Sequence, residues 1–389
     1  MIAATAASGT ELDLARMRRE RRGKLLAAMA AQGVDALVLL GQNNVTYAIG
    51  ARVPAAEPAR AAHSRPVAVL TRDDEVHLFT AAPEGAPPEL ATDHVHGALA
   101  VEWDAGARAL ATRLPSGLLA CDEYAMSVRA ALAGREIADA AGVLGAAKIV
   151  KTHDELECIR RAQEINETAM VDVAELVRPG VRATDLSGRF LRRAFELGAS
   201  ANTVDPIFQV MPPSVAAGPY SATGDVVFPT PTRPRELVEG DVIWVDTGLN
   251  YEGYASDFGC TWVVGGAQPH HREQFARWRA LVDEVLEAVR PGATAGDLVR
   301  AAIPAGGRRP WLPHLYLAHG IGTDSAEMPY VGTDLGQAFD DSVVLAPGMV
   351  LVFEPVIWDD GRAGYRAEEI VAVTETGWRM LSARAEAPA

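Results

Sequence analysis

The chain is poor in cysteine and lacks both a long apolar run and an excess of positive charge. Its 3 cysteines, Cys121, Cys158 and Cys260, are far apart and match no CxxC spacing, which argues against a disulfide framework. No stretch approaches the roughly 18 apolar residues that cross a bilayer. The N-terminal sequence also lacks the pattern of a signal peptide. These absences predict a cytoplasmic protein with reduced cysteines and no membrane partner.

The shortage of positive charge also bears on binding partners. A net charge of −15 disfavours nucleic acid and anionic membranes, because phosphate groups are bound by clustered lysine and arginine. One basic run, Arg16 to Lys24, is interpreted as a solvated helix face. The pair His270 and His271 is interpreted in the same way, as an exposed helix start.

A length of 389 residues predicts two domains, with three as the alternative. In the first of them, 19–31 has a helical pattern, 35–40 and 118–121 are typical of buried strands, and 66–71 with 75–79 predict a hairpin. We therefore expect a small α/β domain over residues 1–147, without a catalytic cluster of its own.

The second domain, over 148–389, is predicted to begin with a long amphipathic helix. Thr152 and Glu155 form a candidate capping box at its start. The helix is expected to end at VRPGVRATDL (177–186), and a later helix ends at VRPGATAGDL (289–298), 112 residues further on. We interpret the shared pattern as an internal duplication, with two related halves packed around a common site.

Two aspartates in this domain are candidate metal ligands. Asp246 is expected on a strand, on the same face as Val242 and Trp244, where a buried carboxylate needs a partner. Asp257 follows eleven residues later. If Gly248 to Gly253 forms a hairpin loop, the two aspartates come from adjacent antiparallel strands.

A histidine and two glutamates complete the candidate set. His319 lies in AHGIG, where glycines allow close approach of the backbone to a ligand. Glu354 ends the apolar strand MVLVFEP, in phase with valines, which favours a ligand or a base. Glu368 and Glu369 must point to opposite faces of a strand, and periodicity alone does not decide between them.

Together these carboxylates and one imidazole suit a pair of divalent cations. The imidazole favours manganese, iron, cobalt or zinc over calcium. Two such ions can polarise a carbonyl and activate water, so the set points to metal-assisted hydrolysis.

The order VDTG, SD, HGIG, EP and RxEE resembles the pita-bread metalloenzyme family of methionine aminopeptidase, aminopeptidase P, prolidase and creatinase. Segment 33–50 resembles the creatinase/prolidase N-terminal domain, and 151–165 resembles the helix that opens the catalytic domain. The resemblance implies an α/β N-terminal domain, an α+β pita-bread catalytic domain with a pseudo-two-fold duplication, two divalent metals and a homodimer. The family motif Arg-x-Glu matches Arg366 and Glu368, and so selects Glu368 over Glu369.

The chain departs from the peptidase pattern at two positions. Ala326 stands seven residues after His319, where peptidases carry a second histidine. By spacing, Phe228 replaces another histidine upstream of Asp246. These changes leave room for a non-peptidase within a peptidase fold, as in creatinase, ectoine hydrolase or a lyase acting on dimethylsulfoniopropionate.

Three functions remain open on the sequence. The first is a metallohydrolase that cleaves a C–N bond in a dipeptide with proline or in a small amide. Glu354 would be its base, and substrate-orienting roles would fall to residues among Arg366, Tyr330, Glu327, Asp324 and His314. The second is a lyase with Asp324 or Tyr330 as base. The third is a non-catalytic binding module, against which the complete ligand set counts.

Overall fold

The computed structural model describes residues 11–52, 65–123, 125–214, 232–306 and 316–388, and these divide into two compact units, Glu11–Lys148 and Ile149–Ala389. The predicted position Phe228 and the candidate His314 lie outside the described residues. Among the described residues, no helix is both long and apolar enough to cross a membrane.

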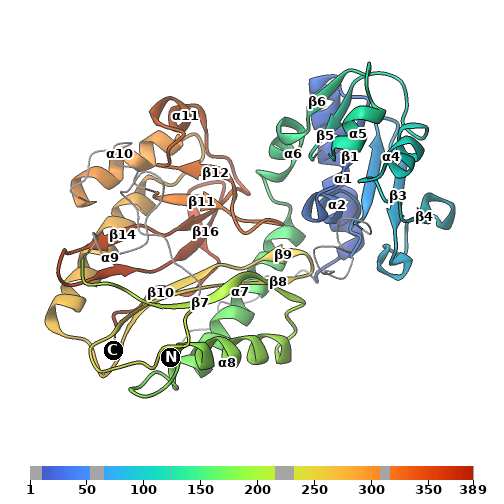
Figure 1. The fold of residues 1–389 in the computed structure, drawn as a ribbon. Helices are drawn as coiled ribbons and strands as arrows, with labels where there is room; N and C mark the ends of the chain where they lie inside the picture. The colour runs from blue at the N-terminus through green and yellow to red at the C-terminus, as the bar shows by residue number, and fades with distance from the viewer. Residues whose placement is uncertain (1–10, 53–64, 124, 215–231, 307–315, 389) are drawn as a thin grey trace. The chain divides into compact units, whose positions relative to one another are not determined.

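The first unit is a mixed six-stranded sheet with helices on both faces (Figure 1). Its strands are β1 (Ala36–Leu39), β2 (Val67–Thr71), β3 (Val76–Thr80), β4 (Val95–Gly97), β5 (Leu119–Cys121) and β6 (Ile137–Asp139), in the order β4-β3-β2-β1-β5-β6. Its helices are α1 (Leu14–Gln32), α2 (Gln42–Ile49), α4 (Asp104–Ala111), α5 (Met126–Ala131) and α6 (Ala141–Lys148), with short 3-10 turns η1 (Pro83–Gly85) and η2 (Thr92–His94). Alternation along β1 explains the layers: Leu37 and Leu39 pack in one apolar core, and Ala36 and Val38 in another.

The predicted elements of this unit are confirmed, with one change inside the basic run. The hairpin of β2 and β3 is antiparallel, as expected. Helix α1 starts earlier than predicted because the side chain of Asp13 accepts a hydrogen bond from the Arg16 backbone and caps it. Arg21 is not solvated: it is buried, donates to the Thr46 carbonyl at 3.1 Å and lies over the Tyr47 ring.

The second unit contains two helix pairs and two main antiparallel sheets. Its first half comprises α7 (His153–Ala174), α8 (Ala183–Glu196), β7 (Ala201–Val210), β8 (Val242–Tyr251), β9 (Tyr254–Ala255) and β10 (Phe258–Val263). Its second half comprises α9 (Pro269–Ala288), α10 (Ala295–Gly306), β11 (Ala318–Gly320), β12 (Glu327–Val331), α11 (Gln337–Ser342), β13 (Val350–Phe353), β14 (Val356–Trp358), β15 (Gly364–Arg366), β16 (Glu369–Val373) and β17 (Trp378–Met380). The sheet orders are β10-β8-β7 and β12-β11-β13-β16-β17, with β14 and β15 as a separate ribbon.

The two sheets lie between the two helix pairs (Figure 1). Helices α7 and α8 share an apolar core with β7 and β8, and α9 and α10 share another with β11, β13 and β16. The capping box of α7 is present: Thr152 accepts from the Glu155 backbone and Glu155 accepts from the Thr152 backbone. Helix α9 begins at Pro269 with His271 buried, so the expectation of an exposed histidine pair is wrong for His271.

The internal duplication is visible in the backbone hydrogen bonds. Gly180 and Gly292, in the two V-R-P-G turns, both have φ of 84°, a left-handed conformation that glycine adopts without strain. The Gly180 amide donates to the Leu237 carbonyl, and the Gly292 amide to the Leu345 carbonyl, both at 2.9 Å. In each half, the turn between the two helices is therefore hydrogen-bonded to the segment that precedes a strand of the sheet, which confirms the duplication that the sequence predicts.

Candidate metal centre

Five side chains from both halves converge on one buried site. Asp246 lies in β8, and Asp257 one residue before β10. His319 lies in β11, Glu354 directly after β13, and Glu368 directly before β16. Because both sheets contribute, the site forms where the duplicated halves meet.

The two aspartates are placed by the hairpin of β8 and β10. Asp246 pairs with Gly259 across the ladder. The expected loop from Gly248 to Gly253 is wrong, because β8 continues to Tyr251 and the chain reverses at Glu252 and Gly253. Both turn residues have positive φ, 52° and 87°, as a tight hairpin turn requires. The aspartates nevertheless reach the same site, as expected.

Three carboxylates form the centre of the site. Asp246, Asp257 and Glu368 each offer an oxygen, and these oxygens lie within 4.8 Å of one another. The three residues are only 8%, 6% and 6% exposed, respectively. Like charges at this separation repel strongly in a buried setting, so the arrangement needs a compensating positive charge.

His319 and Glu354 lie beside these carboxylates. The Nε2 atom of His319 is 3.4 Å from Asp257 Oδ2 and 3.2 Å from Glu354 Oε1. Its Nδ1 atom is 2.8 Å from the Gly320 carbonyl oxygen, which can only accept. Nδ1 therefore carries a proton, and Nε2 is the nitrogen available to a metal.

Arg366 is the residue of this chain whose positive charge compensates the carboxylates. Its guanidinium contacts Glu354 and Glu368 through Nη2 and lies 3.2 Å from Asp246 Oδ2 through Nη1. It also lies over the Trp244 ring, 5.1 Å from the centroid. One arginine against four carboxylates leaves a net charge of −3 when all four are ionised and His319 is neutral.

The pKa shifts follow from this imbalance. Burial, opposed by Arg366 and reinforced by Asp257, raises the pKa of Asp246 to about 7. Burial likewise raises the pKa of Glu368 well above its usual range, although Arg366 opposes it. Burial would lower the pKa of His319, but its contacts with Asp257 and Glu354 raise it well above its ordinary value.

The metal-ligating atoms of these residues suit divalent cations, as two observations show. Oε2 of Glu368 is buried and has no hydrogen-bond donor among the described residues, whereas Oε1 has an ion-pair contact with Arg366. A buried acceptor without a donor is costly, and a cation at this position would satisfy it. The donor set of carboxylate oxygens and one imidazole suits manganese, iron, cobalt and zinc.

Gly259 is a site residue that the sequence analysis missed. A Cβ atom at this position would lie 2.6 Å from Glu368 Oε1 and 2.6 Å from Arg366 Nη1. Its carbonyl also accepts from the Glu368 backbone at 3.0 Å and so links the two sheets. The available signal was a glycine inside a strand pattern, which often marks a close approach.

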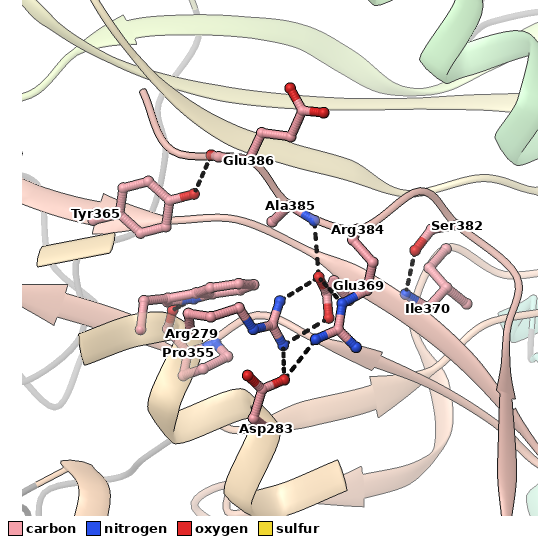
Figure 2. Close-up of polar contacts among 11 residues, drawn as sticks. Arg279, Asp283, Pro355, Tyr365, Glu369, Ile370, Ser382, Arg384, Ala385 and Glu386 are labelled. Atoms are coloured by element: carbon pink, nitrogen blue, oxygen red, sulfur yellow. Dashed lines mark hydrogen bonds and ion pairs between the residues drawn. The ribbon is translucent and has the colours of Figure 1, made fainter. Parts of the chain in front are cut away.

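A second missed feature lies on the opposite side of β16 from the candidate ligand Glu368. The buried carboxylate of Glu369 pairs with Arg279 and accepts from the Ala385 backbone at 2.8 Å. Arg384 and Asp283 complete this polar network (Figure 2). The contacts settle the ambiguity between the two glutamates: Glu368 faces the carboxylate cluster, and Glu369 faces the network that holds the C-terminal segment.

Other candidates lie around the centre with different partners. Glu327 forms a buried ion pair with Lys151 at 2.6 Å. The Tyr330 hydroxyl donates to the carbonyl of Ala326 at 3.2 Å, and Ala326 itself is exposed. Asp324 is half-buried, and its carbonyl accepts from the Gly322 backbone at 3.1 Å. Their substrate-orienting roles stay predictions.

Comparisons with known proteins agree with this geometry. A sequence model of metallopeptidase family M24 matches residues 157–375, and one of the creatinase/prolidase N-terminal domain matches 21–161. The probable dipeptidase PepE of Mycobacterium tuberculosis is 30% identical over 372 residues, which cover 90% of each chain. An Xaa-Pro dipeptidase of Pyrococcus furiosus is 29% identical over 238 residues, 60% of this chain and 63% of that protein.

A solved structure extends the likeness to the fold of the whole chain. The prolidase of Thermococcus sibiricus superposes with a TM-score of 0.77 at 20% identity, covering 97% of this chain and 99% of that one. The M24 match by itself spans more than half of the sequence. The chain therefore belongs to metallopeptidase family M24, a family of metallohydrolases, and carries a creatinase/prolidase N-terminal domain.

Proposed function

We propose that the protein is a dinuclear metal-dependent hydrolase that cleaves a C–N bond, in an Xaa-Pro dipeptide or in a small amide. The observation that carries the proposal is the convergence of Asp246, Asp257 and Glu368 with His319 and Glu354 in one buried site. The similarity to an Xaa-Pro dipeptidase and a probable dipeptidase supports a short peptide as the substrate.

The proposed metal ligands are Asp246, Asp257, His319, Glu354 and Glu368. We propose two ions of the manganese, cobalt, iron or zinc class, because four carboxylates balanced by one arginine leave charge for more than one divalent cation. When bound, such ions polarise a carbonyl group and lower the pKa of water towards neutrality. We also propose that residues 148–389 form the catalytic domain and residues 1–147 the N-terminal domain.

Glu354 is the proposed general base. Its side chain is 21% exposed, against 11% for Asp246 and 1% for Glu368, so it is the most accessible of these three carboxylates to water and substrate. Burial would raise the pKa of Glu354, but Arg366 and His319 lower it to about 2. The carboxylate is therefore ionised. Because a low pKa makes it a weak base, its proposed role of taking a proton from attacking water and delivering it to the leaving nitrogen requires water that bound metal ions have made more acidic.

Arg366 is proposed to hold the carboxylates together rather than to contact only substrate. It reaches Asp246, Glu354 and Glu368 at once. Its backbone is fixed by Thr261, whose hydroxyl donates to the Arg366 carbonyl at 2.8 Å and accepts from its amide at 2.9 Å. Substrate orientation then falls to the groups around the site, of which Tyr330, Asp324 and Glu327 are described and His314 is not.

A metal-dependent lyase acting on a small carboxylate is the second candidate. The observation that favours it is Ala326, which offers no side chain for proton transfer at the position of a peptidase histidine. Asp324 or Tyr330 would then remove a proton next to the carboxylate, and the leaving group would depart with the bond electrons. The product would carry a new double bond and no oxygen from water.

The test loads the purified protein with manganese or cobalt and assays Xaa-Pro dipeptides beside small zwitterionic amides. Turnover that disappears in Glu354→Ala, with ¹⁸O from labelled water in the carboxylate product, supports the hydrolase. An unsaturated product without ¹⁸O supports the lyase. Metal content is measured on every sample, so that loss of ions is distinguished from loss of the base. A metal-loaded protein that converts none of these substrates contradicts the first proposal.

The family resemblance further predicts a homodimer, and this stays a prediction. Sedimentation velocity at micromolar concentration distinguishes a monomer of 41.3 kDa from a dimer.

A further inference from the structure

Three histidines lie together at one edge of the N-terminal sheet, in a different compact unit from the metal centre. His77 lies in β3, His94 ends the 3-10 turn η2, and His96 lies in the edge strand β4 (Figure 1). In the register of β3 and β4, Phe79 pairs with His96. His77 is two residues from Phe79, so it shares a face of the sheet with His96.

The nitrogen atoms of two of these rings face each other. His77 Nδ1 lies 3.0 Å from His96 Nε2. Two nitrogen ligands of one ion, each about 2.0–2.1 Å from it, are themselves about 2.9–3.4 Å apart for right-angled to tetrahedral geometry. The observed separation, that of a hydrogen bond between the rings, falls inside this range, so both atoms can bind one cation that replaces the shared proton once the rings tilt towards it.

The surroundings of His77 set its tautomer for metal binding. Its Nε2 atom lies 3.1 Å from Glu75 Oε1. A carboxylate only accepts, so Nε2 carries the proton and Nδ1 presents a lone pair towards His96. A histidine that binds a metal through one ring nitrogen commonly donates the N–H of the other to a carboxylate, as His77 does here.

The ring of His96 is also held in place. It stacks on Phe79 with centroids 4.8 Å apart. Burial, reinforced by the neighbouring His77, Arg113 and His94, lowers the pKa of His96, whereas Asp93 opposes this shift. Because His77 Nδ1 accepts, His96 Nε2 is the donor of the hydrogen bond between the two rings, and a bound cation would replace its proton. Arg113 disfavours a bound cation, and the carboxylates of Asp93 and Glu75 counteract it.

His94 supplies a third imidazole at short range. Its ring centroid is 5.1 Å from that of His77, and the His77 and His96 centroids are 5.2 Å apart. In the described part of the chain, three metal-ligating atoms lie within 4.8 Å of one another only at Asp246, Asp257 and Glu368. The nitrogens of the three histidines are therefore further apart than this. His94 must therefore rotate to join the other two rings, and it is only half-buried.

We propose that His77, His94 and His96 form a second divalent-metal site, which takes a borderline ion of the zinc or nickel class and is independent of the catalytic centre. Imidazole nitrogen suits these ions, and no thiolate or carboxylate ligand is required. The site lies on an edge strand with half-buried rings, so an ion can enter from solvent.

The test uses the full chain and Ni²⁺ as the probe, with bound metal counted after equilibrium dialysis over a range of free Ni²⁺. The Glu368→Gln background weakens the catalytic centre and isolates the second site. In that background, His96→Gln is expected to remove one Ni²⁺ per chain, or to weaken its binding at least tenfold. The matched control, His153→Gln, removes a histidine whose side chain is 45% exposed in the other unit and should change nothing.

A second variant guards against misfolding. Glu75→Gln keeps all three imidazoles and removes the carboxylate, so it should weaken Ni²⁺ binding by a smaller factor and leave the thermal midpoint of the metal-free protein unchanged. Cu²⁺ bound to the Glu368→Gln protein should show electron paramagnetic resonance splitting from at least two nitrogens, and His96→Gln should abolish it. Equal Ni²⁺ stoichiometry and affinity with and without His96 would overturn the proposal.

Discussion

Glu368 and Glu369 are neighbours in the chain, yet their carboxylates have opposite surroundings. Glu368 lies among Asp246, Asp257 and Arg366; its Oε1 contacts Arg366, and its Oε2 has no hydrogen-bond donor among the described residues. Glu369 is held by Arg279 and by the Ala385 backbone on the other face of β16. Glu368 is proposed to bind a cation, whereas Glu369 holds the C-terminal segment, so identical substitutions should have different effects.

Glu368→Gln is expected to weaken binding of the catalytic ions at least tenfold without destabilising the metal-free protein, because it removes a charge from a crowded set of carboxylates. Glu369→Gln should keep the ions and lower the free energy of unfolding by about 3 kcal/mol, because Arg279 loses the buried one of its two ionic partners and keeps only Asp283. Metal content after dialysis and urea unfolding of the metal-free proteins measure the two effects. Equal loss of metal in both variants would contradict the assignment.

Gly259→Ala tests how closely the strand approaches the site. The added methyl group would lie 2.6 Å from both Glu368 Oε1 and Arg366 Nη1. We expect lower metal affinity and lower activity, with the thermal midpoint of the metal-free protein falling by only a few degrees. The control is Gly188→Ala in helix α8, where the methyl group meets nothing within 4 Å. That change should stabilise the protein by about 0.5–1 kcal/mol and leave metal binding intact. Normal metal affinity in Gly259→Ala would show that the site has more room than the structure gives it.

The strand pattern was enough to find the candidate ligands that the structure brings together, but not the residues that support them. Asp246 and Glu354 could be found because a carboxylate in phase with buried apolar residues needs a partner. Gly259 and Arg279 could not be identified from the sequence. A glycine in a strand and an arginine on a helix have many ordinary explanations, and only the fold brings them beside Glu368 and Glu369.

The sequence also did not predict the length of the hairpin loop or the burial of individual side chains. The hairpin loop between Asp246 and Asp257 is shorter than expected, because residues Glu252 and Gly253 alone reverse the chain. Arg21 and His271 were expected in solvent, but both are buried, Arg21 against Thr46 and Tyr47 of helix α2. Burial of this kind depends on contacts between distant segments, whereas the duplicated V-R-P-G turns are local patterns and were predicted correctly.

Ala326→His tests whether proton transfer limits peptidase activity. The substitution restores the side chain that peptidases carry seven residues after His319. If the protein is a weak Xaa-Pro hydrolase for want of this group, kcat/KM for an Xaa-Pro dipeptide should rise by roughly tenfold or more, with metal content unchanged. Ala326→Gln, which adds a polar side chain of similar reach without titrating near neutrality, is the control. A rise of the same size in both variants would assign the effect to substrate binding rather than to proton transfer.

His271 should make the stability of the protein depend on pH. It is 5% exposed, and its Nδ1 accepts from the Gln268 backbone at the start of α9. Burial, reinforced by His270 and Arg272, lowers its pKa to about 4. Since the unfolded chain has the ordinary value of about 6.5, it binds the proton more readily. The stabilisation is therefore complete above pH 6.5 and is lost as the pH falls towards 4.

We expect this group to remove on the order of 2 kcal/mol of stability across that window. His271→Gln keeps an acceptor for the Gln268 amide but does not titrate, so its stability should fall less steeply between pH 6.5 and 4. His153→Gln, at an exposed histidine, should follow the unmodified protein. Urea unfolding midpoints at half-unit steps of pH measure the difference. Parallel curves for His271→Gln and the unmodified protein would mean that the imidazole is already reached by solvent in the folded state.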